Sequence, residues 1–256
     1  MKIDLNVDMG ESFGMYVMGD DAGFMPLISS SNVACGFHAG DPCVMRKTVA
    51  LAKEYGTAVG AHPGLPDLQG FGRRNIDLTM DELYCDLLYQ IGALQAFLRA
   101  SKISLHHVKP HGKLYGMAHL REDVARTLCT AIRDIDDNLF LYCMQKGILA
   151  DIAEEFGIHT VFEVYSDLDY DGDGNLVITR QHKVHKPSDV AARVLRMVRD
   201  NKVETTAGTE ISVAGSSVCV HSDSPNAMAI VTAVSGILRE NGYVIATPEL
   251  ADPNPI

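Results

Sequence analysis

The sequence predicts a single α/β domain over residues 1–256, built as an irregular barrel of seven parallel strands. Apolar runs of strand length alternate with segments of helical periodicity, which is typical of a parallel sheet covered by helices. The chain is 46% hydrophobic and long enough to bury one such core. Closing the sheet leaves no exposed edge, so we favour a barrel; an open doubly wound sheet is the alternative.

Each expected strand is a short apolar or alternating run bounded by turn residues. The seven strands are expected at residues 2–8, 32–36, 57–62, 103–110, 138–144, 159–165 and 217–222. The first of them alternates apolar and polar residues strictly, which indicates a strand with two different faces. Residues 243–247 could add one further strand.

The helices between these strands carry start and stop signals. Asp41 and Pro42 provide an N-cap and a first-turn proline, and Gly56 ends that helix. Thr79 and Glu82 form a capping box for a helix that ends near residue 100. Other helices are expected near residues 121–135, 147–156 and 187–200, and a last one from Ser224 and Pro225 to Gly242.

Composition excludes several functional classes. The balance of 22 Lys and Arg against 33 Asp and Glu gives a net charge of −11 without a basic cluster, so we expect no nucleic-acid partner. No apolar run approaches the roughly 20 residues of a membrane span and no signal peptide is recognisable, so we expect no membrane association and a cytoplasmic location. The six cysteines form no CxxC pair and are expected to be reduced.

Histidines end four of the apolar runs, each beside a glycine or a proline: His38, His62, His111 and His221. In a parallel barrel the loops after the carboxyl ends of the strands surround one active site. We therefore expect these histidines to meet there. The residues expected to be catalytic are Asp8, Glu11, His38, Lys109 and His111. Those expected to bind substrate are His62, Arg73, Arg74, Glu163 and His221.

The chemistry of these side chains suggests their roles. Asp8 and Glu11 are three residues apart at a strand end, and two carboxylates in one pocket push their pKa values apart, which suits one of them to general-base work. An arginine binds a carboxylate bidentately, and one of Arg73 and Arg74 is expected to face the site. Alternation places Lys109 on the same strand face as His107.

Alternating aspartates at residues 167–173 have the spacing of a calcium loop. The stretch lacks the flanking helix and the glutamate at the twelfth position, so we expect a DGDGN turn instead. Neither a GxxxxGK[ST] loop nor a GxGxxG fingerprint is present. Asp41, although it lies near the site, is expected to act as a helix cap.

Several long blocks resemble the LamB/YcsF family, whose members include the first of the three components, A, B and C, of the bacterial ATP-dependent 5-oxoprolinase. The blocks are DLNVDMGESFG, SSSNVACGFHAGDP, GAHPGLPDLQGFGRR, YQIGAL, HVKPHGKLY and VCVHSDSP, between residue 4 and about residue 228. The resemblance implies a seven-stranded barrel similar to the glycoside hydrolase and deacetylase superfamily. It implies an ATP-dependent hydrolase that opens 5-oxoproline, with ATP and Mg as cosubstrate and the 5-oxoprolinase B and C subunits as partners.

The chain departs from the family pattern at two places. Leu168 stands where the family has an arginine, and Ser222 stands where a glycine is usual. Another lactam or cyclic amide is therefore an alternative substrate. A metal-dependent deacetylase-type hydrolase, with a divalent metal held by Asp8, His62 and His111, is a second interpretation. A non-catalytic protein that presents substrate to its partners is a third.

Overall fold

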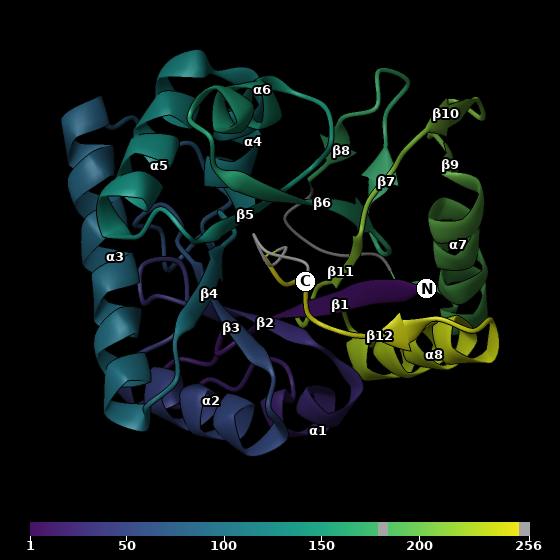
Figure 1. The fold of residues 1–256 in the computed structure, drawn as a ribbon, viewed down its shortest axis with the longest axis horizontal. Helices are drawn as coiled ribbons and strands as arrows, with labels where there is room; N and C mark the ends of the chain where they lie inside the picture. Colours follow the sequence, from purple (N-terminus) through teal and green to yellow (C-terminus); the bar gives the residue numbers. More distant parts are fainter. Residues whose placement is uncertain (179–183, 251–256) are drawn as a thin grey trace, which may run out of the picture.

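The computed structural model, which describes residues 1–178 and 184–250, has a closed barrel of parallel strands at its centre (Figure 1). The strands in order around the barrel are β1 (Lys2–Met9), β2 (Ser30–Ala34), β3 (Ala58–His62), β4 (Leu105–Val108), β5 (Phe140–Cys143), β6 (His159–Tyr165) and β11 (Ser217–Val220). Strand β11 pairs in parallel with β1, Asp4 opposite Ser217, and so closes the ring. The predicted seven-stranded barrel is confirmed, and the open sheet is wrong.

Helices surround the barrel (Figure 1). Those expected from the sequence are α2 (Pro42–Tyr55), α3 (Met80–Ser101), α5 (Glu122–Ile135), α6 (Ile148–Glu155), α7 (Pro187–Asp200) and α8 (Ala227–Glu240). Others that we did not expect are α1 (Asp21–Phe24), η1 (Met25–Leu27) and α4 (Gly112–Leu120). Helix α3 buries the apolar stripe that its periodicity predicts, which includes Leu87, Ile91 and Leu94.

The predicted signals of two helices are confirmed. The Asp41 carboxylate accepts hydrogen bonds from the backbone N–H groups of Cys43 and Val44, and Gly56 ends α2 in the left-handed conformation at φ 69°. Thr79 and Glu82 form a reciprocal capping box at the start of α3. These signals are local in sequence, so no distant contact overrides them.

The predicted start of the last helix is wrong. Helix α8 begins at Ala227, after Asn226, and Ser224 does not cap it. The Ser224 hydroxyl donates instead to Asp167 Oδ2 at 3.1 Å. A hydrogen bond to a charged carboxylate is stronger than one between neutral groups, and Asp167 is too remote in sequence for the local pattern to reveal it.

Three short pairings lie outside the ring. Strands β7 (Asp169–Tyr170) and β8 (Leu176–Val177) form a hairpin whose turn is held by Asp171, which accepts from the N–H groups of Asp173 and Asn175 at 2.9 Å. This confirms the predicted turn. Strands β9 (Lys202–Glu204) and β10 (Glu210–Ser212) form another hairpin, and β12 (Val244–Ile245) pairs with the start of β1.

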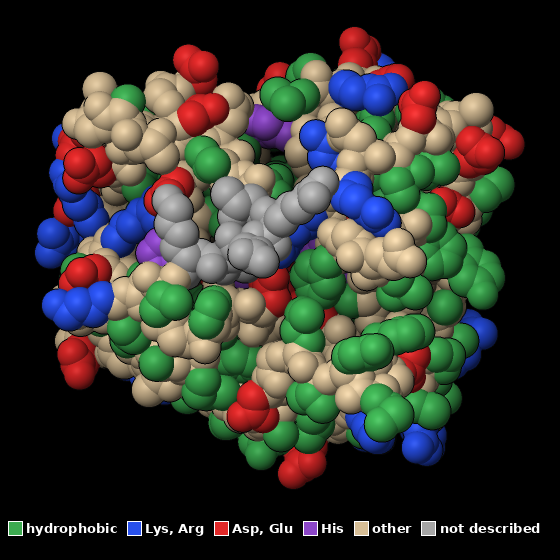
Figure 2. Space-filling model, turned by 180° about the vertical axis from the view of Figure 1, so that it is seen from behind, with side chains coloured by type: hydrophobic (Ala, Val, Ile, Leu, Met, Phe, Trp, Pro, Cys, Tyr) green, Lys and Arg blue, Asp and Glu red, His purple; other side chains and the backbone are tan. Residues whose placement is uncertain are grey.

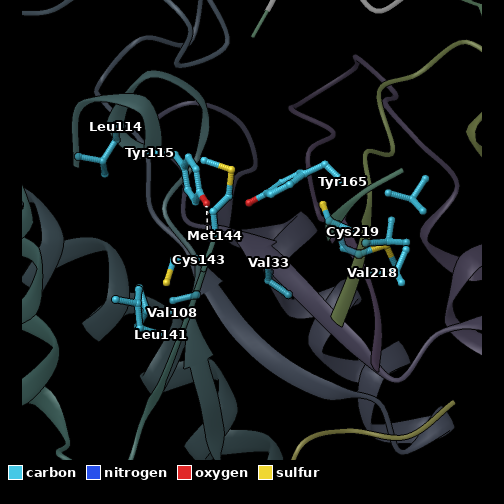
Figure 3. Packing of buried hydrophobic residues seen from close by; sticks show 14 of the residues in the cluster. Val33, Val108, Leu114, Tyr115, Leu141, Cys143, Met144, Tyr165, Val218 and Cys219 are labelled. Carbon is cyan, nitrogen blue, oxygen red and sulfur yellow. Dashed lines mark hydrogen bonds between the residues drawn. The ribbon is translucent and has the colours of Figure 1, made fainter. Parts of the chain in front are cut away.

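The core has an apolar part and a polar part. Apolar side chains fill the space between barrel and helices and continue to Tyr115 and Tyr165 at the carboxyl end of the barrel (Figure 3). The barrel interior is polar, because Asp4, Asn6 and Asp8 alternate with the apolar residues of β1 and are all buried.

Acidic and basic side chains are interspersed over the face shown in Figure 2. In the described ranges, none of the helices is both long and apolar enough to cross a membrane. All six cysteines lie within those ranges, and each is a free thiol, as the sequence predicts.

Candidate active site

The carboxyl ends of the barrel strands surround one cavity. Its lining comprises Asp8, His62, Arg73, Lys109, Pro110, His111, Gly112, Tyr115, Tyr165, Leu168, Leu176, Ile178 and His221. Six of the ten site residues expected from the sequence are among them. Glu11, His38 and Glu163 are buried beside residues of this lining, and Arg74 faces another way.

Asp8 is a buried carboxylate with different partners on its two oxygens. Its Oδ1 accepts from Asn32 Nδ2 at 2.8 Å and from Lys109 Nζ at 3.1 Å. Its Oδ2 lies 3.3 Å from His62 Nε2 and 3.8 Å from His221 Nε2. Burial alone would raise the pKa of Asp8, but His62 and Lys109 hold it well below its ordinary value, so Asp8 is ionised at neutral pH.

Glu11 returns to the same site through a glycine turn. Gly10 has φ +69°, a conformation that favours glycine, and it bends the chain so that Glu11 is buried. The Ser222 hydroxyl donates to Glu11 Oε2 at 2.8 Å. Burial, with Asp223 and Asp8 nearby, raises the pKa of Glu11 well above its ordinary value. The two carboxylates therefore differ in the way that their proximity predicts.

Three histidines and Glu11 form a compact cluster at the ends of the first four strands. One ligand atom from each of Glu11, His38, His62 and His111 lies within 4.8 Å of all the others, and all four residues are buried. The rings of His38 and His111 stack with centroids 3.7 Å apart. Burial holds the pKa values of His38 and His111 well below their ordinary values, so both rings are neutral.

Hydrogen bonds to the backbone fix two of these rings. His62 Nδ1 lies 2.7 Å from the Lys109 carbonyl, and His111 Nε2 lies 2.8 Å from the Phe71 carbonyl. A carbonyl only accepts, so each of these nitrogens carries the hydrogen. The other nitrogens of the two rings, His62 Nε2 and His111 Nδ1, face each other at 2.9 Å. Such a contact requires a proton or a metal ion between them.

These residues fit a metal ion. Neither ring nitrogen of the buried His38 has a hydrogen-bond partner within the described part of the chain. Backbone carbonyls that hold the outer nitrogens of His62 and His111 are the usual support of metal-binding histidines. Zinc–nitrogen bonds of about 2.0–2.1 Å place the ligands of one ion within roughly 4 Å of each other, so a small closing movement brings all four atoms onto one ion.

The cluster differs from the set expected from the sequence. His62 and His111 belong to it as expected, but Glu11 and His38 complete it in place of Asp8. Asp8 is grouped instead with Cys219 and His221. Asp8 lies at the edge of the cluster, because its Oδ2 is 3.3 Å from His62 Nε2 while Asn32 and Lys109 hold its Oδ1.

His221 and Asp167 form a dyad at another part of the lining. Asp167 Oδ1 lies 2.8 Å from His221 Nδ1, and Oδ2 accepts from the His221 backbone N–H at 3.0 Å. Burial alone would lower the pKa of His221, but the Asp167 carboxylate more than offsets it and raises that pKa. The dyad presents His221 Nε2 toward the cavity and toward Asp8 Oδ2, which lies 3.8 Å away.

Lys109 is enclosed by acceptors. Its Nζ lies 3.1 Å from Asp8 Oδ1, 2.8 Å from Cys219 Sγ and 3.5 Å from Glu163 Oε1. Burial would lower the pKa of Lys109, but Asp8, Cys219 and Glu163 raise it well above its ordinary value. A charged lysine thus forms part of the cavity lining.

The two arginines have different surroundings. Arg73 lines the cavity and pairs with Asp223 at 2.8 Å. Arg74 pairs with Asp67 and is about half exposed, so it does not reach the cavity, contrary to its expected role in binding substrate. Glu163 lies within β6 rather than in a loop, and it accepts from Asn6 Nδ2 at 2.7 Å and from the Tyr165 hydroxyl at 3.0 Å.

One part of the lining is apolar. It is formed by Leu168, Leu176 and Ile178 together with the aromatic rings of Tyr115 and Tyr165. The hydroxyl ends of the two tyrosines point toward each other in Figure 3, where the backbone N–H of Met144 donates to the Tyr115 hydroxyl at 2.7 Å. The site thus combines charged groups with an apolar side.

Further residues contact the ten expected ones or one another. They are Asn6, Asn32, His107, Asp167, Cys219, Ser222 and Asp223. Alternation along the first strand could have identified Asn6, because it shares a face with Asp8. Asp167 and Asp223 follow predicted strands, a position that indicates the loops around the site.

Comparisons with known proteins agree over nearly the whole chain. The LamB/YcsF family model matches residues 3–252. A protein from Staphylococcus carnosus that is named as the A component of 5-oxoprolinase is 45% identical over 96% of this chain and 98% of its own. The crystal structure of the lactam utilization protein from Thermus thermophilus superimposes with a TM-score of 0.90 at 42% identity, covering 96% of this chain and 99% of that one.

A more distant likeness concerns the fold alone. The catalytic domain of a peptidoglycan N-acetylglucosamine deacetylase from Eubacterium rectale has a TM-score of 0.51 at 12% identity, over 98% of this chain and 91% of that one. The expected similarity to the deacetylase type of barrel is thereby confirmed.

Proposed function

This chain belongs to the LamB/YcsF family, and we propose that it is the A component of an ATP-dependent 5-oxoprolinase, which opens 5-oxo-L-proline to L-glutamate as it hydrolyses ATP. The observation that carries the proposal is similarity along nearly the full length to a protein of that name, at 45% identity. The name of the superimposed lactam utilization protein supports the same class of substrate. The polar cavity described above is the proposed site.

The chemistry of a lactam explains the need for ATP. A five-membered cyclic amide is a poor electrophile, and transfer of the ATP γ-phosphoryl group to the amide oxygen makes its carbon open to attack by water. The ring C–N bond then breaks and leaves an acyl phosphate, which a second water molecule hydrolyses to the carboxylate and inorganic phosphate. The protein has to position water, remove its proton, stabilise the oxyanion and protonate the leaving nitrogen.

The residues lining the cavity can perform these steps. Asp8 lines the cavity as an ionised acceptor and is proposed to remove the proton from water, with Glu11 as the alternative base. Lys109 and His111 are proposed to stabilise the oxyanion. His221, whose pKa Asp167 raises, is suited to protonate the ring nitrogen as the C–N bond breaks.

Arg73 is proposed to bind the substrate carboxylate. Its guanidinium lines the cavity, and a guanidinium has five N–H donors, so its contact with Asp223 is compatible with a second carboxylate. The apolar ring carbons of the substrate would then lie along Leu168 and Ile178. Glu163 and His62 support this arrangement through their contacts with Lys109 and Asp8.

ATP, with Mg, is the proposed cosubstrate, and the 5-oxoprolinase B and C subunits are the proposed partners, in the cytoplasm. The chain has neither a GxxxxGK[ST] loop nor a GxGxxG fingerprint. We therefore propose that the partners complete the nucleotide site. The names of the relatives, which designate one component of a larger enzyme, support an assembly of this kind.

The test is ATP-dependent formation of glutamate from 5-oxoproline, by the chain alone and after mixing with purified B and C subunits. We expect glutamate only in the mixture, in proportion to the ATP consumed. A mixture that assembles, as size-exclusion chromatography would show, but forms no glutamate refutes the proposal. Activity of the isolated chain would refute the proposed role of the partners.

A second candidate, a metal-dependent cyclic-amide hydrolase, is favoured by the Glu11, His38, His62 and His111 cluster. These four residues would hold a divalent metal ion such as zinc, which when bound would polarise a carbonyl or activate water. Elemental analysis of the purified protein, and activity after chelation and metal restoration, test it. ATP-independent, chelator-sensitive ring opening would favour this candidate over the first.

A further inference from the structure

Three polar side chains inside the barrel have no part in the proposed chemistry. Asn6 from β1, Asn32 from β2 and His107 from β4 are completely buried, and Asn32 contacts Asp8 directly. A buried amide or imidazole is costly unless its donors and acceptors are paired. The way in which these three groups are paired determines how Asp8 is held.

The orientation of the first amide is determined by charged and backbone neighbours. Lys109 Nζ, which only donates, lies 3.2 Å from Asn6 Oδ1. The Val218 carbonyl, which only accepts, lies 3.4 Å from Asn6 Nδ2. Asn6 therefore presents its carbonyl oxygen to the neighbouring strand β2, where Asn32 Nδ2 donates to it at 2.7 Å.

The orientation of Asn32 follows from that of Asn6. Its amide nitrogen has two hydrogens, which go to Asn6 Oδ1 at 2.7 Å and to Asp8 Oδ1 at 2.8 Å. The Asn32 oxygen then faces His107 Nε2 at 2.7 Å and must accept from it. His107 thus completes a polar chain in which each of these donors has an acceptor.

The barrel is built to hold the His107 ring in this place. The Tyr142 ring stacks on it with centroids 4.0 Å apart and planes 17° apart. Gly60 of β3 leaves the space that the ring occupies, because a Cβ there would lie 2.1 Å from His107 Nε2. Without the His107 hydrogen bond, the buried Asn32 oxygen would lose its donor, so the amide would shift to relieve the unpaired acceptor and would move the Asp8 carboxylate that it holds.

We propose that His107 is a positioning residue for Asp8 and acts through Asn32. The terminal torsion of an aspartate side chain has only a weak preference, so the hydrogen-bond donors around the carboxylate determine its orientation. Asn32 and Lys109 hold Asp8 Oδ1, which directs Oδ2 toward His62 and His221. The consequence for turnover rests on the proposed function, but the hydrogen-bond chain itself does not.

Turnover by the assembled enzyme tests the role with three variants. His107→Leu removes the donor, and His107→Gln restores one through its side-chain N–H. Tyr142→Phe is the control, because it keeps the stacked ring and removes only a hydroxyl that contacts Ser30 and Asp4, neither of which contacts Asn32 or His107 through its side chain. We expect His107→Leu to lower kcat by roughly 10- to 100-fold with KM within a few-fold, which is the range expected for a misplaced catalytic group.

We expect His107→Gln to recover a large part of that loss and Tyr142→Phe to keep the wild-type kcat. A wild-type kcat in His107→Leu, a loss confined to KM, or a glutamine variant no better than leucine would overturn the proposal. Asn32→Asp provides a second route to the same result, since it replaces the donor to Asp8 by an acceptor without changing size. The kcat of Asn32→Asp should fall by about the same factor as the kcat of His107→Leu.

A measurement on the wild-type protein does not depend on turnover or on folding of a variant. Nitrogen-15 spectra of the histidine side chains should show hydrogen on Nε2 of His107, with slow exchange, whatever the state of Nδ1, which faces His106 Nδ1 at 2.9 Å. An Nε2 without hydrogen overturns the proposal. If wild-type enzyme forms no glutamate, the proposed function fails, and these spectra still decide the hydrogen-bond chain.

Discussion

Replacing Lys109 by methionine should destabilise the protein strongly, because it leaves two buried carboxylates without their cation. The side chains of Lys109, Asp8 and Glu163 are each at most 3% exposed, and the ammonium lies 3.1 and 3.5 Å from the two carboxylates. Removing one partner of a buried ion pair costs about 3–5 kcal/mol. For a chain of this size that loss corresponds to a decrease in Tm of roughly 6–20 °C.

The pKa shifts of Asp8 and Lys109 determine the pH at which the stability of Lys109→Met should be measured. The pKa of Asp8 is lowered in the fold, so its contribution is present above the ordinary value of 3.8 and is lost as the pH falls through the lowered value. The pKa of Lys109 is raised, so its contribution is present below the ordinary value of 10.5 and is lost as the pH rises through the raised value. At pH 7 both contributions are complete.

Urea unfolding at pH 7 measures the effect, and a surface pair provides the control. Lys186 lies 3.5 Å from Asp189, but both side chains are more than 70% exposed, so Lys186→Met should change the free energy of unfolding by less than about 1 kcal/mol. A loss of less than about 1 kcal/mol in Lys109→Met would refute the view that Lys109 is the charged partner of both carboxylates. Adding Glu163→Gln should recover part of the loss.

Three further predictions concern single groups. Asp167→Asn removes the carboxylate that raises the pKa of His221, so the alkaline limb of the turnover profile should move to lower pH, and an unmoved limb would contradict the dyad. Zinc binding should release the proton that Glu11 retains because of its raised pKa, and should weaken as the pH falls. Calorimetry in buffers of different ionisation enthalpy counts the protons released, and Glu11→Gln should lower that number by about one. Thr79→Ala breaks the capping box of α3 and should cost about 0.5–2 kcal/mol in urea unfolding, with no change in turnover.

The barrel was predictable because its signals are local. Alternation along residues 2–8, glycine stops and helix caps act within a few residues, and the first strand and the capping box of Thr79 form as expected. The start of α8 was not predictable in the same way, because the partner of Ser224 is Asp167 at the end of a different strand. A partner that is distant in sequence can override a local helix signal, and the local residue pattern does not indicate that partner.

The location of the candidate site was predictable from the sequence, but most of the contacts within the site were not. Histidines at strand ends indicated where side chains converge, and His38, His62 and His111 do lie together. Which of the site residues contact one another was not predictable, because the register between strands determines that Lys109 contacts Asp8 and that Glu11 lies beside the histidines. Arg73 pairs with Asp223, which lies far along the chain, whereas Arg74 pairs with the nearby Asp67.

The central claim is that Asp8, at the carboxyl end of this barrel, is the base that activates water to open the lactam ring. The direct measurement is release of glutamate from 5-oxoproline by the assembled enzyme with ATP, comparing wild type and Asp8→Asn. A general base contributes about 10²- to 10⁴-fold, so the variant should lose turnover by that factor while it still assembles with its partners. Wild-type turnover by an assembled Asp8→Asn enzyme would contradict the claim.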